Sequence, residues 1–365
     1  MTDLSRVFTE EDQNKRWFVT GGAGFIGSHV SEFYARKGED VVVLDNLSRA
    51  ELLGYDALNA MYNWDHLKVY ENIELIKGDI RDRELIRRMA RDVDVIIHAA
   101  AQTAVTVSLN DPQTDFEINA VGTFNVLEAA RMSKNNPSLI FCSTNKVYGN
   151  NVNKIPVRDC GNKYEFADNQ FRKGISETFS IDLCEHTPYG ASKLTGDIYV
   201  QDYAQRNEIE AAVFRMSCIY GTRQFGVEDQ GWVAWFTIAT LLGKPITIFG
   251  DGKQVRDVLY VSDLVEAFDA FVQKRHKVNY GVYNVGGGSG NLISLLDLLS
   301  MLHDITGLST EVATDAWRPS DQKVYVSDIS KISSELDWTP KITPRNGVKL
   351  LIDWIDNNKN IFNDI

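Results

Sequence analysis

Short apolar runs alternate with helical patterns through the first half of this 365-residue chain. The runs are rich in β-branched residues and are bounded by turn or helix signals, which is typical of buried parallel strands. Parallel strands need crossover connections, and the helical segments between the runs supply them. The pattern therefore predicts a doubly wound parallel sheet, with strands at Arg16–Thr20, Asp40–Leu44, Glu74–Lys77, Val93–His98, Ser138–Cys142 and Ala211–Arg215.

A glycine-rich turn, TGGAGFIG, follows the first predicted strand and opens the first helix. Gly21 permits the tight turn, Gly24 lets backbone N–H groups approach a pyrophosphate, and Gly27 lets helix and strand pack closely. A helix N-terminus attracts phosphate without any basic side chain. With Phe25 and Ile26, these glycines are the predicted pyrophosphate site of a dinucleotide.

Residues at the ends of the following strands fit the same ligand. Asp45 ends the second strand, where a carboxylate can accept hydrogen bonds from the ribose hydroxyls of adenosine. Together with Asn46 it would repel a 2′-phosphate, which favours NAD over NADP, although the nearby Arg49 keeps NADP open. The other predicted cofactor contacts follow the third and fourth strands, at Asp79, Ile80, Ala99 and Ala100.

Composition excludes several classes of protein. The chain has 38 Lys and Arg against 50 Asp and Glu, a net charge of −12, so binding to nucleic acid or an anionic membrane is not expected. Its four cysteines form no CxxC pair and its six histidines are dispersed, so neither a disulfide framework nor a metal site is predicted. The N-terminus is polar and no apolar run can span a bilayer, which indicates a cytoplasmic protein.

Beyond about residue 222 the alternation stops, and helical stretches mix with short strands such as Ile246–Phe249 and Val282–Val285. We therefore expect a dinucleotide-binding domain over residues 1–222 and a smaller mixed α/β domain over 223–365, with an approximate boundary and interleaved segments. Residues 150–186 are polar and weakly periodic. A stretch of this length is more often a binding loop than a spacer, so we expect it to cover the substrate.

The sequence YGASK places Tyr189 and Lys193 four residues apart, on one face of a helix expected from Pro188 to about Arg206. An ammonium beside a phenol, with the positive charge of an oxidised nicotinamide, favours the phenolate and lowers the pKa of the tyrosine. The pair is common by chance, and the glycine-rich turn upstream is what makes it informative. It indicates a group for proton transfer.

TGGAGFIG, Asp45, STNKVYG and YGASK, in this order, resemble the extended short-chain dehydrogenase/reductase superfamily, in particular its nucleotide-sugar epimerases and dehydratases. The resemblance extends from about Arg16 to Trp354. It implies an α/β fold: a Rossmann-type doubly wound parallel sheet with a smaller mixed α/β substrate domain. It also implies NAD as cofactor, a homodimer, and a catalytic triad of Thr144, Tyr189 and Lys193, the last two also in contact with the cofactor.

Departures from the family pattern narrow the reaction. The family's 4,6-dehydratases carry an acidic pair after the catalytic threonine, where this chain has Asn145 and Lys146, and an amide and an ammonium cannot eliminate water in that way. STNKVYG, RMSCIYG and QFGVEDQGW instead resemble the CDP-paratose 2-epimerase (CDP-tyvelose epimerase) branch. In that branch a cysteine, here Cys218, also replaces the usual asparagine, and a buried packing role for it is at least as plausible as a chemical one.

The resemblance further implies substrate contacts from the second half. Arg256, in GDGKQVRD, would bind the nucleotide pyrophosphate. In WRPSD, Arg318 would bind the phosphates and Asp321 would lie near the ribose. Guanidinium groups suit pyrophosphate oxygens. With Thr144 and Asn145, these residues form the predicted substrate site.

The expected activity is redox-neutral epimerisation of a CDP-linked hexose at C2, through transient oxidation to a ketone and return of the hydride. A UDP-sugar 4-epimerase and a net nucleotide-sugar oxidoreductase remain alternatives, because the residues do not determine which carbon reacts. A non-catalytic dinucleotide-binding regulator is a remote alternative, since it would not need Thr144, Tyr189 and Lys193 together.

Overall fold

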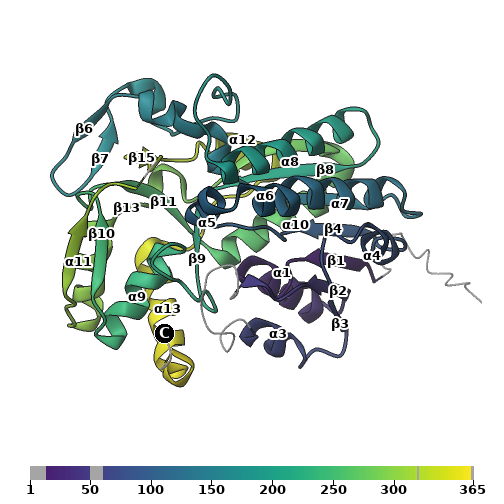
Figure 1. Cartoon of the computed structure of the whole chain (residues 1–365), viewed down its shortest axis with the longest axis horizontal. Coiled ribbons are helices and arrows are strands. Elements are labelled where there is room, and N and C mark those ends of the chain that lie inside the picture. Colours follow the sequence, from purple (N-terminus) through teal and green to yellow (C-terminus); the bar gives the residue numbers. More distant parts are fainter. Residues whose placement is uncertain (1–13, 50–60, 319, 363–365) are drawn as a thin grey trace, which may run out of the picture.

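The computed structural model describes residues 14–49, 61–318 and 320–362, so the polar N-terminus lies outside the described ranges. A large sheet with helices on both faces occupies one side of the molecule, and a smaller group of strands and helices lies at the other end (Figure 1). Within these ranges, no helix has both the length and the apolar character needed to cross a membrane.

The large sheet has the order β12-β8-β5-β4-β1-β2-β3, and every neighbouring pair is parallel. Each strand expected from the alternation is present and begins and ends within two residues of its predicted bounds. The predicted Rossmann-type sheet is therefore confirmed. Its strands are β1 (Arg16–Thr20), β2 (Asp40–Asp45), β3 (Ile73–Lys77), β4 (Val95–His98), β5 (Ser138–Thr144), β8 (Ala211–Met216) and β12 (Tyr280–Val285).

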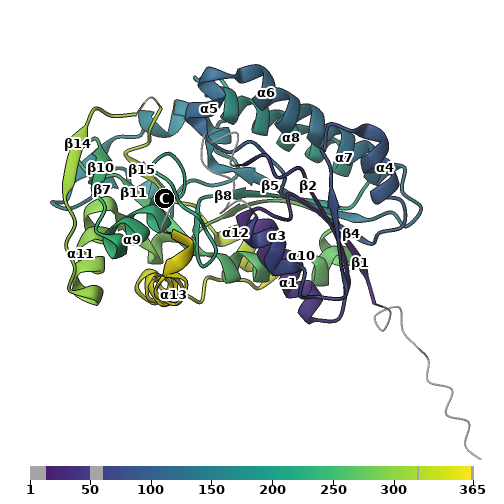
Figure 2. The ribbon, with the colours of Figure 1, turned by 60° about the horizontal axis from the view of Figure 1, so that its bottom comes forward.

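Helices cover both faces of this sheet (Figure 2). Because successive strand residues point to opposite faces, Trp17 and Val19 join one buried core and Phe18 joins the other. One face carries α1 (Phe25–Arg36), α3 (Tyr62–Leu67), α10 (Val261–Val278) and α12 (Ser330–Leu336). The other carries α4 (Arg83–Met89), α5 (Val105–Asn110), α6 (Pro112–Phe116), the π-helix η2 (Glu117–Val121), α7 (Gly122–Arg131) and α8 (Pro188–Gln205).

The smaller part is built around β11 (Val255–Tyr260), which pairs with β9, β13 and β15 and leads directly into α10 on the large sheet. The strand predicted at residues 282–285 is β12, and it lies in the large sheet beside β8. The remaining elements are β9 (Cys218–Tyr220), β10 (Ile246–Phe249), β13 (Leu292–Ser294), β14 (Val312–Asp315), β15 (Val324–Tyr325), α9 (Trp232–Leu242), α11 (Leu295–Thr306) and α13 (Pro344–Asn357).

Residues 150–186 have more secondary structure than their weak periodicity predicts. They contain the end of the 3₁₀-helix η3 (Asn145–Lys154), an antiparallel hairpin and a short 3₁₀-helix. Tertiary contacts hold them, since Phe171 packs against Phe166 and Phe179, and the N–H of Ile175 donates to the carbonyl oxygen of Val326 at 2.7 Å. The added elements are β6 (Val157–Asp159), β7 (Tyr164–Phe166) and η4 (Asn169–Phe171).

A buried ion pair fastens α8 to the sheet. Asp197 on α8 accepts hydrogen bonds from Nε and Nη2 of Arg215 on β8, at 2.9 and 3.1 Å, and from the hydroxyl of Ser143 at 2.7 Å. The side chains of Arg215 and Asp197 are 3% and 0% exposed. Because water reaches neither charge, each depends on the other for its stabilisation.

We expect Arg215→Met to lower the free energy of unfolding by about 3–5 kcal/mol, because it leaves the Asp197 carboxylate buried without a counter-charge. Arg206→Met, at the end of α8, is the matched control, since its partner Asp202 is exposed and such pairs contribute about 0–1 kcal/mol. Urea unfolding followed by circular dichroism measures both losses. Equal losses would contradict this account of the buried pair.

Candidate active site

The turn between β1 and α1 has no room for side chains. A Cβ at Gly21 would lie 2.6 Å from the backbone of Ala100, and one at Gly27 would lie 2.2 Å from the carbonyl oxygen of Gly21. Gly21 also has a φ of +70°, which glycine adopts without strain. The first N–H groups of a helix lack intrahelical acceptors, so the start of α1 offers donors to an anion. The turn is therefore a cradle that fits a pyrophosphate.

One cleft collects the residues predicted to bind the cofactor. They come from successive strand ends, and the carboxyl ends of parallel strands meet at one edge of the sheet. Lys193 does not line the cleft; it lies one helical turn beyond Tyr189 and is 2% exposed. The predicted residues along the cleft are Gly21, Gly24, Phe25, Ile26, Gly27, Asp45, Asn46, Asp79, Ile80, Ala99, Ala100, Thr144 and Tyr189.

Two carboxylates stand at the ends of β2 and β3. Asp45 accepts hydrogen bonds from the N–H groups of Ala23 and Leu47, at 3.0 and 2.8 Å, and burial raises its pKa. Burial would also raise the pKa of Asp79, but hydrogen bonds from Arg81 and Asn46 lower it to about 2. Asp79 therefore lines the cleft as an ionised carboxylate that already accepts hydrogen bonds from Arg81 and Asn46.

The hydroxyl of Thr144, at the end of β5, lies close enough to the phenol of Tyr189 to act on its pKa. Tyr189 lies in the first turn of α8, where Pro188 occupies the first position and the hydroxyl of Thr187 accepts from the N–H of Gly190 at 3.2 Å. These capping interactions start the helix at this residue. The sequence thus directs the phenol toward the end of the strand that carries Thr144.

Burial dominates the titration of both members of the YxxxK pair. It raises the pKa of Tyr189 to about 12, against the effect of the Thr144 hydrogen bond. It also lowers the pKa of Lys193 to about 8, and the ammonium lies 4.2 Å from the ring centroid of Phe141. The expected lowering of the tyrosine pKa is therefore not reached in the protein by itself, because desolvation outweighs the effect of the Thr144 hydroxyl.

A buried carboxylate behind the pair was not predicted. Asp115 on α6 is 1% exposed and accepts hydrogen bonds from Ser192, Gln102 and Asn119 at 2.5, 2.9 and 3.1 Å. Ser192 lies within YGASK, so these bonds hold the first turn of α8 in place. No spacing in the sequence distinguishes Asp115 from an ordinary exposed residue of a short helix.

The residues predicted to bind substrate fall into two groups. In the first, Arg256 on β11 donates to the carboxylate of Asp321 at 2.6 Å and to the carbonyl oxygen of Gln322 at 2.7 Å. The amide of Asn145 donates to the side chain of Gln322 at 3.4 Å. A continuous set of contacts thus joins Arg256 to the end of β5, beside Thr144.

Arg318 stands apart from that group. It donates to the carbonyl oxygen of Glu228 at 3.0 Å, pairs with Asp229 at 2.9 Å and stacks on Phe249 at 3.9 Å. With Asp321 it lines a second cavity, next to residues 150–157. The two predicted phosphate-binding arginines therefore each have a carboxylate partner.

Residues 224–231 bridge the walls of the cleft, which the sequence did not predict. Arg49, after β2, donates to the carbonyl oxygen of Phe225 at 2.8 Å and to the side chain of Gln230 at 3.2 Å. The amide of Gln230 also donates to the hydroxyl of Thr103, after β4. The segment therefore links the ends of two strands on either side of the glycine turn.

Cys218 lines the cleft and accepts the indole N–H of Trp232 at 3.0 Å. Burial raises the pKa of its thiol to about 12, so the sulfur stays protonated and this environment favours packing over nucleophilic chemistry. Among the described residues, no three His, Cys, Asp or Glu side chains are grouped as they would be to hold a metal ion.

Known proteins resemble this chain over most of its length. Residues 17–286 match the NAD dependent epimerase/dehydratase family. A CDP-paratose 2-epimerase from Salmonella typhi is 38% identical over 343 residues, which cover 92% of this chain and 98% of that protein. A UDP-glucuronate 4-epimerase from Thermodesulfobacterium geofontis is 28% identical over 357 residues, which cover 96% of this chain and 98% of that one.

The fold leads to the same family. The crystal structure of a UDP-glucuronic acid 4-epimerase from Bacillus cereus, in complex with UDP-glucuronic acid and NAD, superposes with a TM-score of 0.78 at 28% identity. That match covers 94% of this chain and 99% of the other. The glycine cradle at the start of α1 fits the pyrophosphate of that cofactor. The chain therefore belongs to the NAD-dependent epimerase/dehydratase family, among its nucleotide-sugar epimerases, and its cofactor is NAD.

Proposed function

We propose that this protein epimerises a CDP-linked hexose at C2. The observation that carries the proposal is the sequence Thr144-Asn145-Lys146 at the end of β5. The threonine hydroxyl lies close to the phenol of Tyr189, and an amide and an ammonium follow it in place of an acidic pair. The hydroxyls of Thr144 and Tyr189 suit reversible oxidation of an alcohol. Asn145 and Lys146 lack the carboxyl groups that elimination of water needs. The relative that is 38% identical and is a CDP-paratose 2-epimerase supports the nucleotide and the carbon.

NAD, when bound, supplies a hydride acceptor that later returns the hydride. The glycine turn would hold its pyrophosphate through the N–H groups at the start of α1. Asp45 and Asn46 would bind the adenosine ribose, which selects NAD over NADP. Asp79 and Ile80 would border the adenine, and Ala99 and Ala100 would lie against the dinucleotide.

Tyr189 would act as the base. As phenolate it removes the proton from the reacting hydroxyl, while Thr144 donates a hydrogen bond to the same oxygen and the C–H bond gives up its hydride. Lys193, with a pKa of about 8, carries its positive charge at neutral pH and favours the phenolate. The resulting ketone would rotate in the pocket and present its other face. Tyr189 would then return the proton to the oxygen when the ketone is reduced on that face.

The substrate's nucleotide would lie toward the second half of the chain. Arg256 and Arg318 would bind the diphosphate, Asp321 the nucleoside ribose, and Asn145 the sugar. The arginines must exchange their present carboxylate partners for phosphate oxygens or share them.

The four unpaired cysteines fit a reducing cytoplasm, where we propose that the protein is located.

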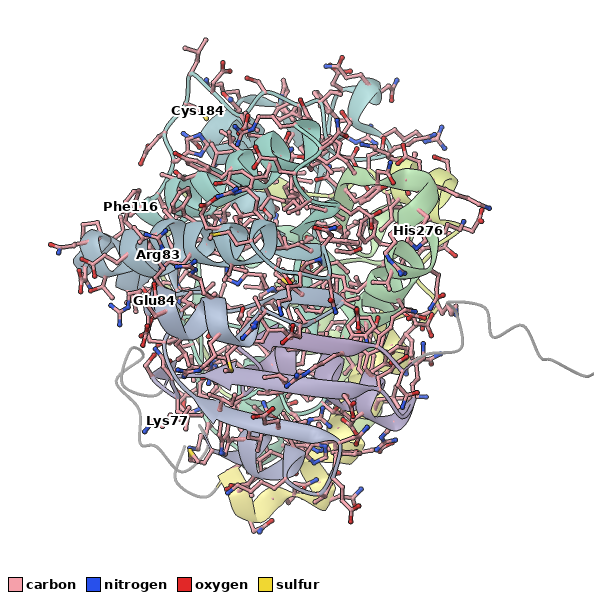
Figure 3. The ribbon with its side chains drawn as sticks, turned by 90° about the vertical axis from the view of Figure 1, so that its right-hand side faces the viewer. Lys77, Arg83, Glu84, Phe116, Cys184 and His276 are labelled. Carbon is pink, nitrogen blue, oxygen red and sulfur yellow. The ribbon has the colours of Figure 1, made fainter. Side chains whose placement is uncertain are left out.

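A second copy of this chain is the proposed partner. Large apolar side chains, each between 40% and 49% exposed, lie on the outer side of α5 to α8 and the π-helix between them. Phe116 projects from that edge of the molecule in Figure 3. An apolar face of this kind marks a protein interface. It consists of Leu109, Phe116, Val121, Phe124, Met132, Ile198 and Tyr199.

Incubation of the purified protein with CDP-, UDP-, GDP- and dTDP-hexoses, followed by NMR of the products, tests the activity. We expect inversion at C2 of a CDP-hexose, without accumulation of NADH, because the hydride returns to the substrate. Inversion at C4 of a UDP-sugar would replace the proposal with the 4-epimerase alternative. NADH formed in step with product would replace it with an oxidoreductase.

Tyr189→Phe should reduce turnover by about 10²–10⁴-fold, because the variant keeps the ring but loses the proton-transfer group. Tyr199→Phe, on the exposed side of the same helix, is the control and should keep its activity. Dinucleotide released by denaturation should be equal in both variants. Full activity of Tyr189→Phe would remove the tyrosine from the mechanism.

Phe124→Asp should separate the dimer, because it places a charge at the centre of the apolar face, in contact with Tyr199. Leu350→Asp, on α13 and 43% exposed, is the control for adding a charge elsewhere. Light scattering after size exclusion measures the mass against the 41.1 kDa of one chain. A monomeric wild-type protein, or two variants that both stay dimeric, would refute this interface.

A further inference from the structure

Lys146 follows the catalytic threonine by two residues and has no role in the function proposed above. Its N–H donates to the hydroxyl of Thr144 at 3.2 Å, and its carbonyl oxygen packs against Gly190, next to Tyr189. The backbone of Lys146 is thus held between Thr144 and the first turn of α8, which carries Tyr189. Its side chain reaches toward the second half of the chain, since the charges of Arg256 and Asp321 both act on the pKa of its ammonium.

The ammonium of Lys146 forms no hydrogen bond or ion pair within the part of the chain that the structure describes. Its neighbours differ in this respect, because Arg256 pairs with Asp321 and Arg318 pairs with Asp229. Burial, and next the charge of Arg256, lower the pKa of Lys146 to about 8. A partly buried cation that contacts no carboxylate is unfavourable, and among the described residues the ammonium of Lys146 contacts none.

The chemistry of the substrate says where an anion would lie. A nucleotide sugar carries its diphosphate on the oxygen of C1. When C2 faces Tyr189, the sugar-linked phosphate lies just beyond the neighbouring carbon and is therefore close to the reacting atoms. When C4 faces Tyr189, the ring separates that phosphate from them. A cation held beside Thr144 would therefore be within reach of the phosphate in the first orientation and far from it in the second.

The other side of the pocket offers little competition for this phosphate. Cys218 lines the cleft, but its sulfur accepts the indole N–H of Trp232, and a thiol is a weak donor. The side-chain amide of Asn145, the residue between Thr144 and Lys146, already donates to Gln322. Lys146 is therefore a strong donor close to Thr144 in the sequence whose ammonium has no acceptor among the described residues.

We propose that Lys146 binds the sugar-linked phosphate of the substrate and so selects the orientation in which C2, and not C4, reacts. The inference rests on the proposed function for the identity of the carbon. It assigns Lys146 a specificity-determining role that the triad and the two arginines do not fill. Proton and hydride transfer stay with Tyr189, Thr144 and NAD.

CDP carries the phosphate that is linked to the sugar and CMP lacks it, so comparing the two ligands in the wild type and in Lys146 variants isolates the contribution of this lysine. In calorimetry with the NAD-loaded protein, Lys146→Gln should weaken CDP binding by roughly tenfold or more and leave CMP binding unchanged. Lys146→Arg keeps the charge and should retain most of the affinity for CDP. Lys134→Gln, an exposed lysine at the opposite end of β5, is the control.

The products of the same variants test the orientation. Lys146→Gln should lower kcat/KM for inversion at C2 by at least the loss in CDP affinity, and Lys146→Arg should restore it. Equal loss of CDP and CMP affinity, or unchanged C2 inversion in Lys146→Gln, would overturn the inference while leaving the epimerase intact. Absence of C2 inversion in the wild type would instead overturn the proposed function, and the CDP and CMP comparison would still decide whether Lys146 binds the phosphate.

Discussion

The close approach of Gly21 to the backbone of Ala99 and Ala100 is the contact on which the site depends. It brings the first and fourth strands together at their carboxyl ends without side chains between them, and it leaves the start of α1 open. A dinucleotide can then lie across strand ends that come from residues far apart in the chain. The same edge of the sheet carries Thr144, so the strand geometry that binds the cofactor also sets the position of the chemistry.

The local arrangement of charged and polar groups, and not the net charge, determines which anionic ligands this protein can bind. The chain has a net charge of −12, yet its family binds NAD and nucleotide sugars, both of which are anionic. In the proposed function, backbone donors bind one pyrophosphate, and a small number of cations, most of them with a carboxylate partner, bind the other. Such pairing keeps the arginines in place in a protein whose overall field would otherwise repel the substrate.

The sequence predicts the large sheet and the cofactor cleft well because both depend on local signals. Strand periodicity and the residues that directly follow each strand are enough to place Asp45, Asp79 and Ala99. Contacts between distant segments leave no such signal: Gln230 and Thr103 are 127 positions apart, and Asp115 and Ser192 are 77 apart. Arg256, Arg318 and Asp321 were predicted as substrate contacts from the family resemblance alone. The short strands and the 3₁₀-helix within residues 150–186 were not predicted, because tertiary packing stabilises them.

The position of β12 has a consequence for how this protein is made. Residues 280–285 complete the large sheet beside β8, although β9, α9, β10 and β11 of the smaller part precede them in the chain. Until they emerge from the ribosome, β8 is an edge strand whose side chains, apart from Arg215, are apolar and whose backbone groups are unpaired on one side. A nascent chain that pauses, or a fragment cut near residue 222, would present that edge to other chains. The large sheet is therefore complete only once residues 280–285 have been synthesised.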